Sequence, residues 1–186
     1  NKPSQEGLVR HFEAVANAAP RPVMLYNVPL RTSCNMTAET TLTLAKHPNV
    51  CGIKEASGNL SQISAILAGR PSGFAVWSGD DALALPTVAM GAEGLISVLG
   101  NAFPSSFSSM IQQAAFGQVH EARATHAAFA ELVALIFEEG NPTGIKNVMH
   151  HLGLCKAEVR LPLVKASKPL AERIYAAIAA LDVPAK

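Results

Sequence analysis

The sequence has few cysteines, little net charge and no long apolar run, and each shortage excludes a class of protein. Its three cysteines, Cys34, Cys51 and Cys155, are odd in number and widely spaced, so they indicate neither a disulfide framework nor a CxxC zinc site. Free thiols are typical of a cytoplasmic protein. A formal net charge of +1 argues against a nucleic-acid partner, which requires a basic surface. No apolar run is long enough to span a membrane, so no membrane partner is expected.

The signatures of bound cofactors are missing as well. The sequence contains neither a GxGxxG loop nor a P-loop, the glycine-rich segments that bind nucleotide phosphates. His120 and His126 are six residues apart, a spacing that does not place two ligands on one helix face. We therefore expect no metal ion and no nucleotide cofactor.

What the sequence does contain is a repeating alternation of short apolar runs and longer amphipathic segments. Of its 186 residues, 49% are hydrophobic and 16% are charged, which indicates a globular protein with a core. Continuous apolar runs are typical of strands buried on both faces of a parallel sheet. Such strands are predicted over Val23–Tyr26, Val50–Ile53, Phe74–Trp77 and Gly94–Val98. Strands that alternate with helices predict four βα units in an α/β fold.

The predicted helices have recognisable beginnings. Ser4 is expected to cap a helix that runs to about Ala19, and Thr37 is expected to cap a second helix. After Gly117 the alternation stops, and the remaining pattern predicts helices over 119–137, 142–152 and 167–181. We therefore predict an α/β region over residues 1–117 and a helical region over residues 118–186.

Lys54 is the most informative residue at a strand end, where α/β folds carry their chemistry. An ammonium at the end of a buried strand is desolvated, and desolvation favours the neutral, nucleophilic amine. That amine is what imine formation with a carbonyl substrate requires. The alternative is a structural ion pair of Lys54 with Glu55 or Asp80.

Other polar residues follow the same strands, and each has a structural alternative. Tyr26 could relay a proton beside an amine, or it could be a core aromatic with a satisfied hydroxyl. Arg31 could bind a substrate carboxylate, or it could be a surface cation. Gly79 permits a close approach of the backbone to a ligand. Asp80 and Asp81 could bind a cation, but we prefer Asp81 as the N-cap of the next helix.

Four motifs at these strand ends carry a family resemblance: YNVPLRT (26–32), GIKEASGN (52–59), SGDD (78–81) and GLISV (94–98). Their order and spacing resemble the dihydrodipicolinate synthase / N-acetylneuraminate lyase superfamily over essentially the whole chain. The resemblance implies the C-terminal half of a (β/α)8 TIM barrel, with its strands 5–8, followed by a C-terminal helical region. It also implies that the N-terminal half barrel, with a threonine pair that contacts pyruvate, is absent from this chain. We expect the chain to be stable and active only when that half completes it.

The resemblance also implies roles for individual residues. Lys54 matches the lysine that forms a Schiff base with pyruvate, so that no separate cofactor is needed. Tyr26 matches the tyrosine that passes protons, and Arg31 matches the arginine that holds the carboxylate of the second substrate. Ile96 matches a position that contacts pyruvate, and Gly79 matches a residue whose backbone lies near the second substrate.

The activity implied by the resemblance is a class I synthase of lysine and diaminopimelate biosynthesis. It condenses pyruvate with L-aspartate-4-semialdehyde to 4-hydroxy-tetrahydrodipicolinate, in a cytoplasmic homotetramer built as a dimer of dimers. Two alternatives stay open: a sugar-acid or aromatic-acid aldolase of the same superfamily, and a non-catalytic half barrel that acts as a binding module. Gly144 departs from the family pattern, which usually has proline there, and we expect a local change in packing.

Overall fold

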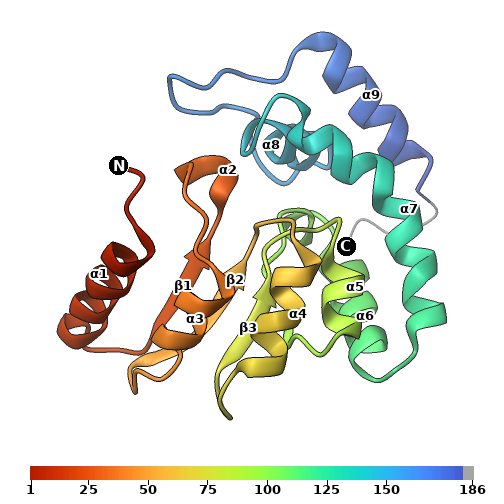
Figure 1. Ribbon diagram of the computed structural model, residues 1–186. Coiled ribbons are helices and arrows are strands. Elements are labelled where there is room, and N and C mark those ends of the chain that lie inside the picture. The colour runs from red at the N-terminus through yellow and green to blue at the C-terminus, as the bar shows by residue number, and fades with distance from the viewer. Residues whose placement is uncertain (182–186) are drawn as a thin grey trace. The chain divides into compact units, whose positions relative to one another are not determined.

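The computed structural model describes residues 1–181, which divide into two compact units, one over Asn1–Ile96 and one from Ser97 onward (Figure 1). The boundary at residue 117 predicted from the sequence pattern lies inside the second unit, between two of its helices. The division of the chain at residue 117 therefore stays a prediction from the sequence pattern. The last five residues of the predicted helical region, 182–186, lie outside the described residues.

The first unit contains a parallel sheet of four strands in the order β1-β2-β3-β4, as predicted. Its elements are α1 (Gln5–Ala18), β1 (Val23–Asn27), α2 (Pro29–Thr32), α3 (Ala38–Leu44), β2 (Val50–Glu55), α4 (Leu60–Gly69), β3 (Ala75–Ser78), α5 (Ala84–Ala89) and β4 (Gly94–Leu95). Two predicted caps are confirmed, because the Ser4 and Thr37 hydroxyls accept hydrogen bonds from Gly7 N–H and Thr40 N–H. The short helix α2 was not predicted.

The fourth strand is shorter than predicted: it covers two residues, where the sequence pattern indicated five. Ile96 N–H still donates to the Ser78 carbonyl at 2.8 Å, but the following residues do not extend the ladder. Instead the Ser97 hydroxyl accepts a hydrogen bond from Gly100 N–H at 2.7 Å, and the chain turns into the 3-10 helix η1 (Leu99–Asn101). A side-chain hydrogen bond of this kind competes with strand pairing, and an apolar run does not reveal it.

One face of the sheet, here called the helix-covered face, packs against helices of the first unit. Leu25, Ile53 and Val76 are register partners on this face, and each is at most 1% exposed. Helices α3 and α4 lie on the same side of the sheet (Figure 1), and they contribute Leu44 and Ile63 to the core. This burial is the main stabilising contribution to the unit, because apolar area removed from water dominates folding free energy.

The opposite face of the sheet, here called the open face, is not covered in the same way. Met24 is 41% exposed and Tyr26 is 44% exposed, and the two alternate along β1 with buried Leu25 and Asn27. The prediction that Val23–Tyr26 is buried on both faces is therefore wrong. Side chains alternate along a strand, and α1, α3 and α4 supply a core to one of the two sides only.

An ion pair between Arg70, which follows α4, and Glu93, which precedes β4, lies at the end of the sheet away from the carboxyl termini of β3 and β4. Arg70 Nη1 lies 2.7 Å from both carboxylate oxygens of Glu93, and Glu93 Oε2 accepts a hydrogen bond from Val76 N–H at 2.7 Å. Burial raises the pKa of Glu93, but the hydrogen bonds from Arg70 and Val76 outweigh it and hold the pKa below its ordinary value of 4.5. The pair therefore stabilises the unit when Glu93 is ionised.

The regular secondary structure in the described residues of the second unit is all helical, and an irregular segment over residues 152–167 separates its last two helices. Its helices are η1, α6 (Pro104–Ala115), α7 (Val119–Glu138), α8 (Thr143–His151) and α9 (Lys168–Ala179). Phe129 of α7 packs edge-on against Phe103 and Phe107, with ring centroids 5.0 and 5.1 Å away. Among the described residues, no helix has the length and apolar character needed to cross a membrane.

Gly144 of α8 lies directly against the backbone of α7. A Cβ atom at this position would overlap the carbonyl group of Ile136, and Gly144 N–H donates to the Gly140 carbonyl at 3.1 Å. Glycine at this position therefore permits closer helix packing than any other residue.

Candidate functional site

Lys54 and Tyr26 lie together at the carboxyl ends of β2 and β1. They are register partners on neighbouring parallel strands, so both side chains point to the open face of the sheet. The Lys54 ammonium nitrogen lies 4.4 Å from the centre of the Tyr26 ring. Contact with an aromatic face is favourable for an ammonium and places the nitrogen beside a phenol.

The structural alternative for Lys54, an ion pair with Glu55 or Asp80, is not what the structure shows. Among the ion pairs of residues 1–181, none includes Lys54. Glu55 is the next residue on the strand and points to the helix-covered face, where it is 1% exposed. Lys54 is half-buried rather than enclosed, so its nitrogen is accessible to a small substrate at the open face.

Gly79 lies against the stem of Lys54, at the end of β3. A Cβ atom added to Gly79 would lie 2.9 Å from Lys54 Cε and 2.9 Å from the Cβ of Ala56. Both distances are shorter than the 3.5–4.0 Å at which carbon atoms normally pack. Glycine at this position therefore provides the space that the lysine side chain occupies.

The two other predicted site residues are at the same edge of the sheet. Ile96 follows β4 by one residue and is 37% exposed; it is two residues after Gly94, the register partner of Trp77. It therefore continues the alternation on the side of Trp77 and Lys54. Arg31 is an exposed residue of α2, the four-residue helix that follows directly after β1. The predicted loop around Arg31 is thus helical, and Pro29 at its first position favours that conformation.

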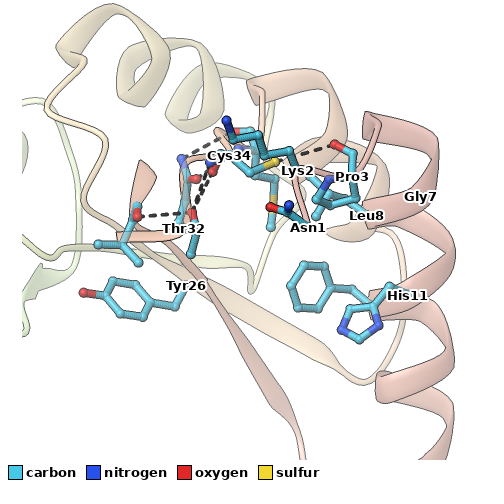
Figure 2. A pocket seen from close by; sticks show the side chains of 13 residues that line it. Asn1, Lys2, Pro3, Gly7, Leu8, His11, Tyr26, Thr32 and Cys34 are labelled. Atoms are coloured by element: carbon cyan, nitrogen blue, oxygen red, sulfur yellow. Dashed lines mark hydrogen bonds between the residues drawn. The ribbon is translucent and has the colours of Figure 1, made fainter. Parts of the chain in front are cut away.

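A cavity of about 590 Å³ lies beside Tyr26, between α1 and the segment that follows β1. Figure 2 shows Tyr26 on one side of the cavity and His11 and Leu8 of α1 on the other. Thr32 and Cys34 form part of its wall, and the Thr32 hydroxyl donates to the Cys34 carbonyl at 2.9 Å. Tyr26 therefore has room around its ring besides the contact with Lys54.

A sequence profile described as the dihydrodipicolinate synthetase family matches residues 1–181. The chain belongs to the dihydrodipicolinate synthetase family. The resemblance in the four strand-end motifs is thereby confirmed at the level of the family.

Curated relatives that match this chain carry one and the same name. A 4-hydroxy-tetrahydrodipicolinate synthase of Cytophaga hutchinsonii is 49% identical over 94% of this chain and 59% of its own length. One of Parabacteroides distasonis is 46% identical over 98% of this chain and 62% of its own length. The chain thus spans about 60% of the length of these curated relatives.

Solved structures of the family share the fold of this chain. A dihydrodipicolinate synthase from Cyanidioschyzon merolae with lysine bound has a TM-score of 0.92 and 40% identity, and covers 97% of this chain and 61% of its own. The enzyme from Thermotoga maritima has a TM-score of 0.93 and 33% identity, and covers 96% and 62%. The α/β fold with a parallel sheet is therefore the family's fold.

A polar cluster that was not predicted from the sequence lies on the helix-covered face, next to the family's strand-end motifs. Asn27 and Glu55 each follow a predicted site residue by one position, and they are 2% and 1% exposed on the helix-covered face. Asn27 Nδ2 lies 3.1 Å from both Glu55 carboxylate oxygens. Strict strand alternation predicts that residues next to Tyr26 and Lys54 face the other way, which could have indicated this cluster.

The predicted cap at Asp81 is wrong. Helix α5 begins at Ala84 after Leu83, which provides no side-chain cap, and Asp81 is 2% exposed before the helix. The Asp80 carboxylate accepts a hydrogen bond from Ala82 N–H at 2.9 Å. The sequence does not show that the helix begins three residues after the second of the two adjacent aspartates, so it could not exclude Asp81 as the N-cap.

In the described part of the chain, no three His, Cys, Asp or Glu side chains gather as a metal site would require.

Proposed function

We propose that this chain forms the imine-forming part of a 4-hydroxy-tetrahydrodipicolinate synthase. The observation that supports this most directly is the position of Lys54 Nζ, 4.4 Å from the Tyr26 ring centre at the carboxyl end of a parallel sheet. A lysine that forms no ion pair with any residue of 1–181 and lies beside a phenol has both a nucleophile and a proton carrier in reach of one small carbonyl compound.

The proposed chemistry begins with the neutral Lys54 amine. Its nitrogen attacks C2 of pyruvate, and the resulting carbinolamine loses water to form an imine, with Tyr26 carrying protons to and from the oxygen that leaves. Loss of a methyl proton gives an enamine, which forms a carbon–carbon bond to the aldehyde carbon of L-aspartate-4-semialdehyde. The amino group of the semialdehyde then attacks the imine carbon and expels the Lys54 amine, which closes the ring of 4-hydroxy-tetrahydrodipicolinate and restores Lys54, so the reaction requires no separate cofactor.

Three other residues complete the proposed site. Arg31, exposed on α2, would bind the carboxylate of the semialdehyde through charge-assisted hydrogen bonds. Ile96 would contact pyruvate at the open face, and the backbone of Gly79 would lie near the second substrate. An arginine at this position of the YNVPLRT motif favours the synthase over a sugar-acid or aromatic-acid aldolase.

We further propose that a barrel half from outside residues 1–186 completes the open face. The curated relatives are longer than this chain, which spans 59% of the Cytophaga hutchinsonii protein. Met24 and Tyr26 expose apolar area on the open face, and covering such area stabilises a sheet. The N-terminal part of that relative, joined to residues 1–186, gives a protein in which this can be tested, here called the completed barrel. The native mass of the completed barrel tests the expected dimer of dimers.

The test of the proposed function is chemical trapping in the completed barrel. Incubation with pyruvate followed by borohydride should reduce the imine and attach one pyruvate-derived group, which peptide mass spectrometry should locate on Lys54. Lys54→Arg should abolish both the adduct and turnover, because a guanidinium is not deprotonated at accessible pH. Lys46→Arg, at an exposed lysine after α3, is the matched control and should leave the adduct unchanged. An adduct on another lysine, or none in the unmodified protein, would contradict the proposal.

A panel of aldehydes then separates the related enzymes. Consumption of L-aspartate-4-semialdehyde in preference to sugar-acid and aromatic aldehydes supports the synthase. Preference for one of the other aldehydes would assign the chain to a different pyruvate-dependent aldolase. A protein that never forms the pyruvate adduct would instead be a binding module.

A further inference from the structure

Glu55 has an unusual environment for a carboxylate in the interior of a protein. It is 1% exposed, and no ion pair among residues 1–181 includes it. Four hydrogen bonds reach its oxygens instead. Oε1 accepts from Asn27 Nδ2 at 3.1 Å and from Ser57 N–H at 2.7 Å, and Oε2 accepts from Asn27 Nδ2 and Gln62 Nε2, each at 3.1 Å. Every partner is a donor, which suits an ionised carboxylate.

The groups that meet here come from three different elements and from the loop after β2, and we call Glu55, Asn27, Gln62 and the Ser57 N–H the Glu55 cluster. Asn27 is the last residue of β1, Glu55 is the last residue of β2, and Gln62 lies in the first turn of α4. Asn27 and Glu55 are register partners, so their side-chain bonds cross between the strands where the ladder between β1 and β2 ends. The cluster therefore fixes the two strand ends relative to each other and to α4.

The amide orientations in the Glu55 cluster are fixed from outside it. Asn27 Oδ1 accepts a hydrogen bond from Met36 N–H at 3.0 Å, and Gln62 Nε2 also donates to the Met36 carbonyl at 3.1 Å. A rotation of either amide by half a turn would break these bonds. Neither Asn27 nor Gln62 can therefore present an oxygen to residue 55 without losing its hydrogen bond to Met36.

The residues directly before Asn27 and Glu55 are Tyr26 and Lys54, on the opposite face of the same strands. A shift of the two strand ends relative to each other would change the 4.4 Å separation of the Lys54 nitrogen from the Tyr26 ring. We propose that the Glu55 cluster is a positioning device, which holds Lys54 over Tyr26 from the far side of the sheet. The consequence for imine formation rests on the function proposed above, whereas the effect on the position of Lys54 does not.

The test compares Glu55→Gln with Glu93→Gln in the completed barrel. Each carboxylate oxygen of Glu55 accepts two hydrogen bonds. In Glu55→Gln an NH2 group replaces one of these oxygens, so two of the four hydrogen bonds are lost and the NH2 group faces other donors. Glu93 is a matched control, because it is a hydrogen-bonded carboxylate at the other end of the same sheet. Both variants should lower the urea midpoint of unfolding.

The decisive measurement is the NMR signal of the Lys54 ε-methylene group in protein labelled with [13C]-lysine and assigned with Lys54→Arg. The Tyr26 ring current should shift this signal upfield in the unmodified protein and in Glu93→Gln, and the shift should disappear in Glu55→Gln. The rate of borohydride trapping with pyruvate should fall by about 10- to 100-fold in Glu55→Gln only, as expected for a displaced nucleophile.

Two results would overturn the proposal. One is a Glu55→Gln protein that is less stable but keeps the upfield shift and traps pyruvate as fast as Glu93→Gln. The other, should Glu55→Gln not fold, is an unchanged shift in Gln62→Ala, which removes a single donor and keeps the carboxylate. If the unmodified protein shows the upfield shift but forms no pyruvate adduct, the proposed function fails, and the methylene signal still decides whether the Glu55 cluster positions Lys54.

Discussion

Substitution of Gly79 by alanine adds one methyl group at the most crowded point of the site. The new Cβ would lie 2.9 Å from Lys54 Cε, 3.1 Å from Lys54 Cγ and 2.9 Å from the Ala56 Cβ. Normal carbon–carbon packing begins at about 3.5 Å, so each of the closest contacts must lengthen by about 0.6 Å. The Ala56 Cβ is fixed to the backbone just after β2, whereas the lysine stem rotates about four bonds.

The lysine therefore moves more than the backbone does, and the two consequences differ in size. Overpacking costs about 1–3 kcal/mol of stability, and the flexible stem keeps the cost near the lower limit. A displacement of about 1 Å at a reacting nitrogen can reduce the rate by about 100-fold. Gly79→Ala should accordingly lower the free energy of unfolding by only about 1 kcal/mol, while pyruvate trapping by the completed barrel slows by one to two orders of magnitude.

Gly58→Ala is the matched control for this experiment. Gly58 has a φ of +76° and nothing lies within 4 Å of an added Cβ, so alanine introduces backbone strain of about 1–2 kcal/mol without touching Lys54. In urea unfolding, Gly58→Ala should be at least as destabilised as Gly79→Ala. Its single-turnover rate of pyruvate trapping should stay near that of the unmodified protein. Equal trapping rates in the two variants would refute the reasoning that Gly79 makes room for Lys54.

Three further predictions follow from single residues. Arg31→Ala should raise the KM for the semialdehyde by about 10- to 150-fold, because it removes a charge-assisted hydrogen bond worth about 1.5–3 kcal/mol. The variant should leave pyruvate trapping unchanged, and a parallel loss of trapping would contradict the role assigned to Arg31. Glu93 has a lowered pKa, so its stabilising contribution is present above the unfolded-state value of 4.5 and is lost as the pH falls through the lower folded-state value. The Tm should therefore fall more steeply below pH 4.5 in the unmodified protein than in Glu93→Gln, and equal slopes would reject this role. Gly144→Ala should lower the free energy of unfolding, measured with urea, by about 1–3 kcal/mol without changing trapping, because its Cβ overlaps the Ile136 backbone; an unchanged free energy of unfolding would contradict the close packing.

The sequence predicts well those features that depend on neighbours along the chain. Ser4 and Thr37 cap their helices because a hydroxyl three residues before a free N–H satisfies it locally. The contact of Lys54 with Tyr26 was also within reach, because consecutive βα units place their strands side by side and their carboxyl ends at one edge.

Features that depend on what covers a surface could not be predicted in the same way. An apolar run such as Val23–Tyr26 is compatible with burial on one face or on two, and only the helices that pack against β1 decide between them. Glu55 was a candidate ion-pair partner for Lys54 when the two were viewed as neighbours in sequence. Its true partners, Asn27 and Gln62, come from other elements, so their hydrogen bonds depend on strand register and helix position.

Two positions on the open face place different demands on whatever completes the proposed barrel. Met24 and Tyr26 are two residues apart on the open face and are similarly exposed, at 41% and 44%. Met24 has no polar atom that needs solvent or substrate, so covering it is favourable by the apolar area removed from water. Tyr26 lies one strand position from the carboxyl edge and must stay accessible to pyruvate if it is to carry protons for Lys54. A completing segment therefore has to cover the open face at the level of Met24 and stop below Tyr26. The Glu55 cluster, on the helix-covered face, makes this compatible with a fixed site, because it holds Lys54 without occupying the side from which substrate arrives.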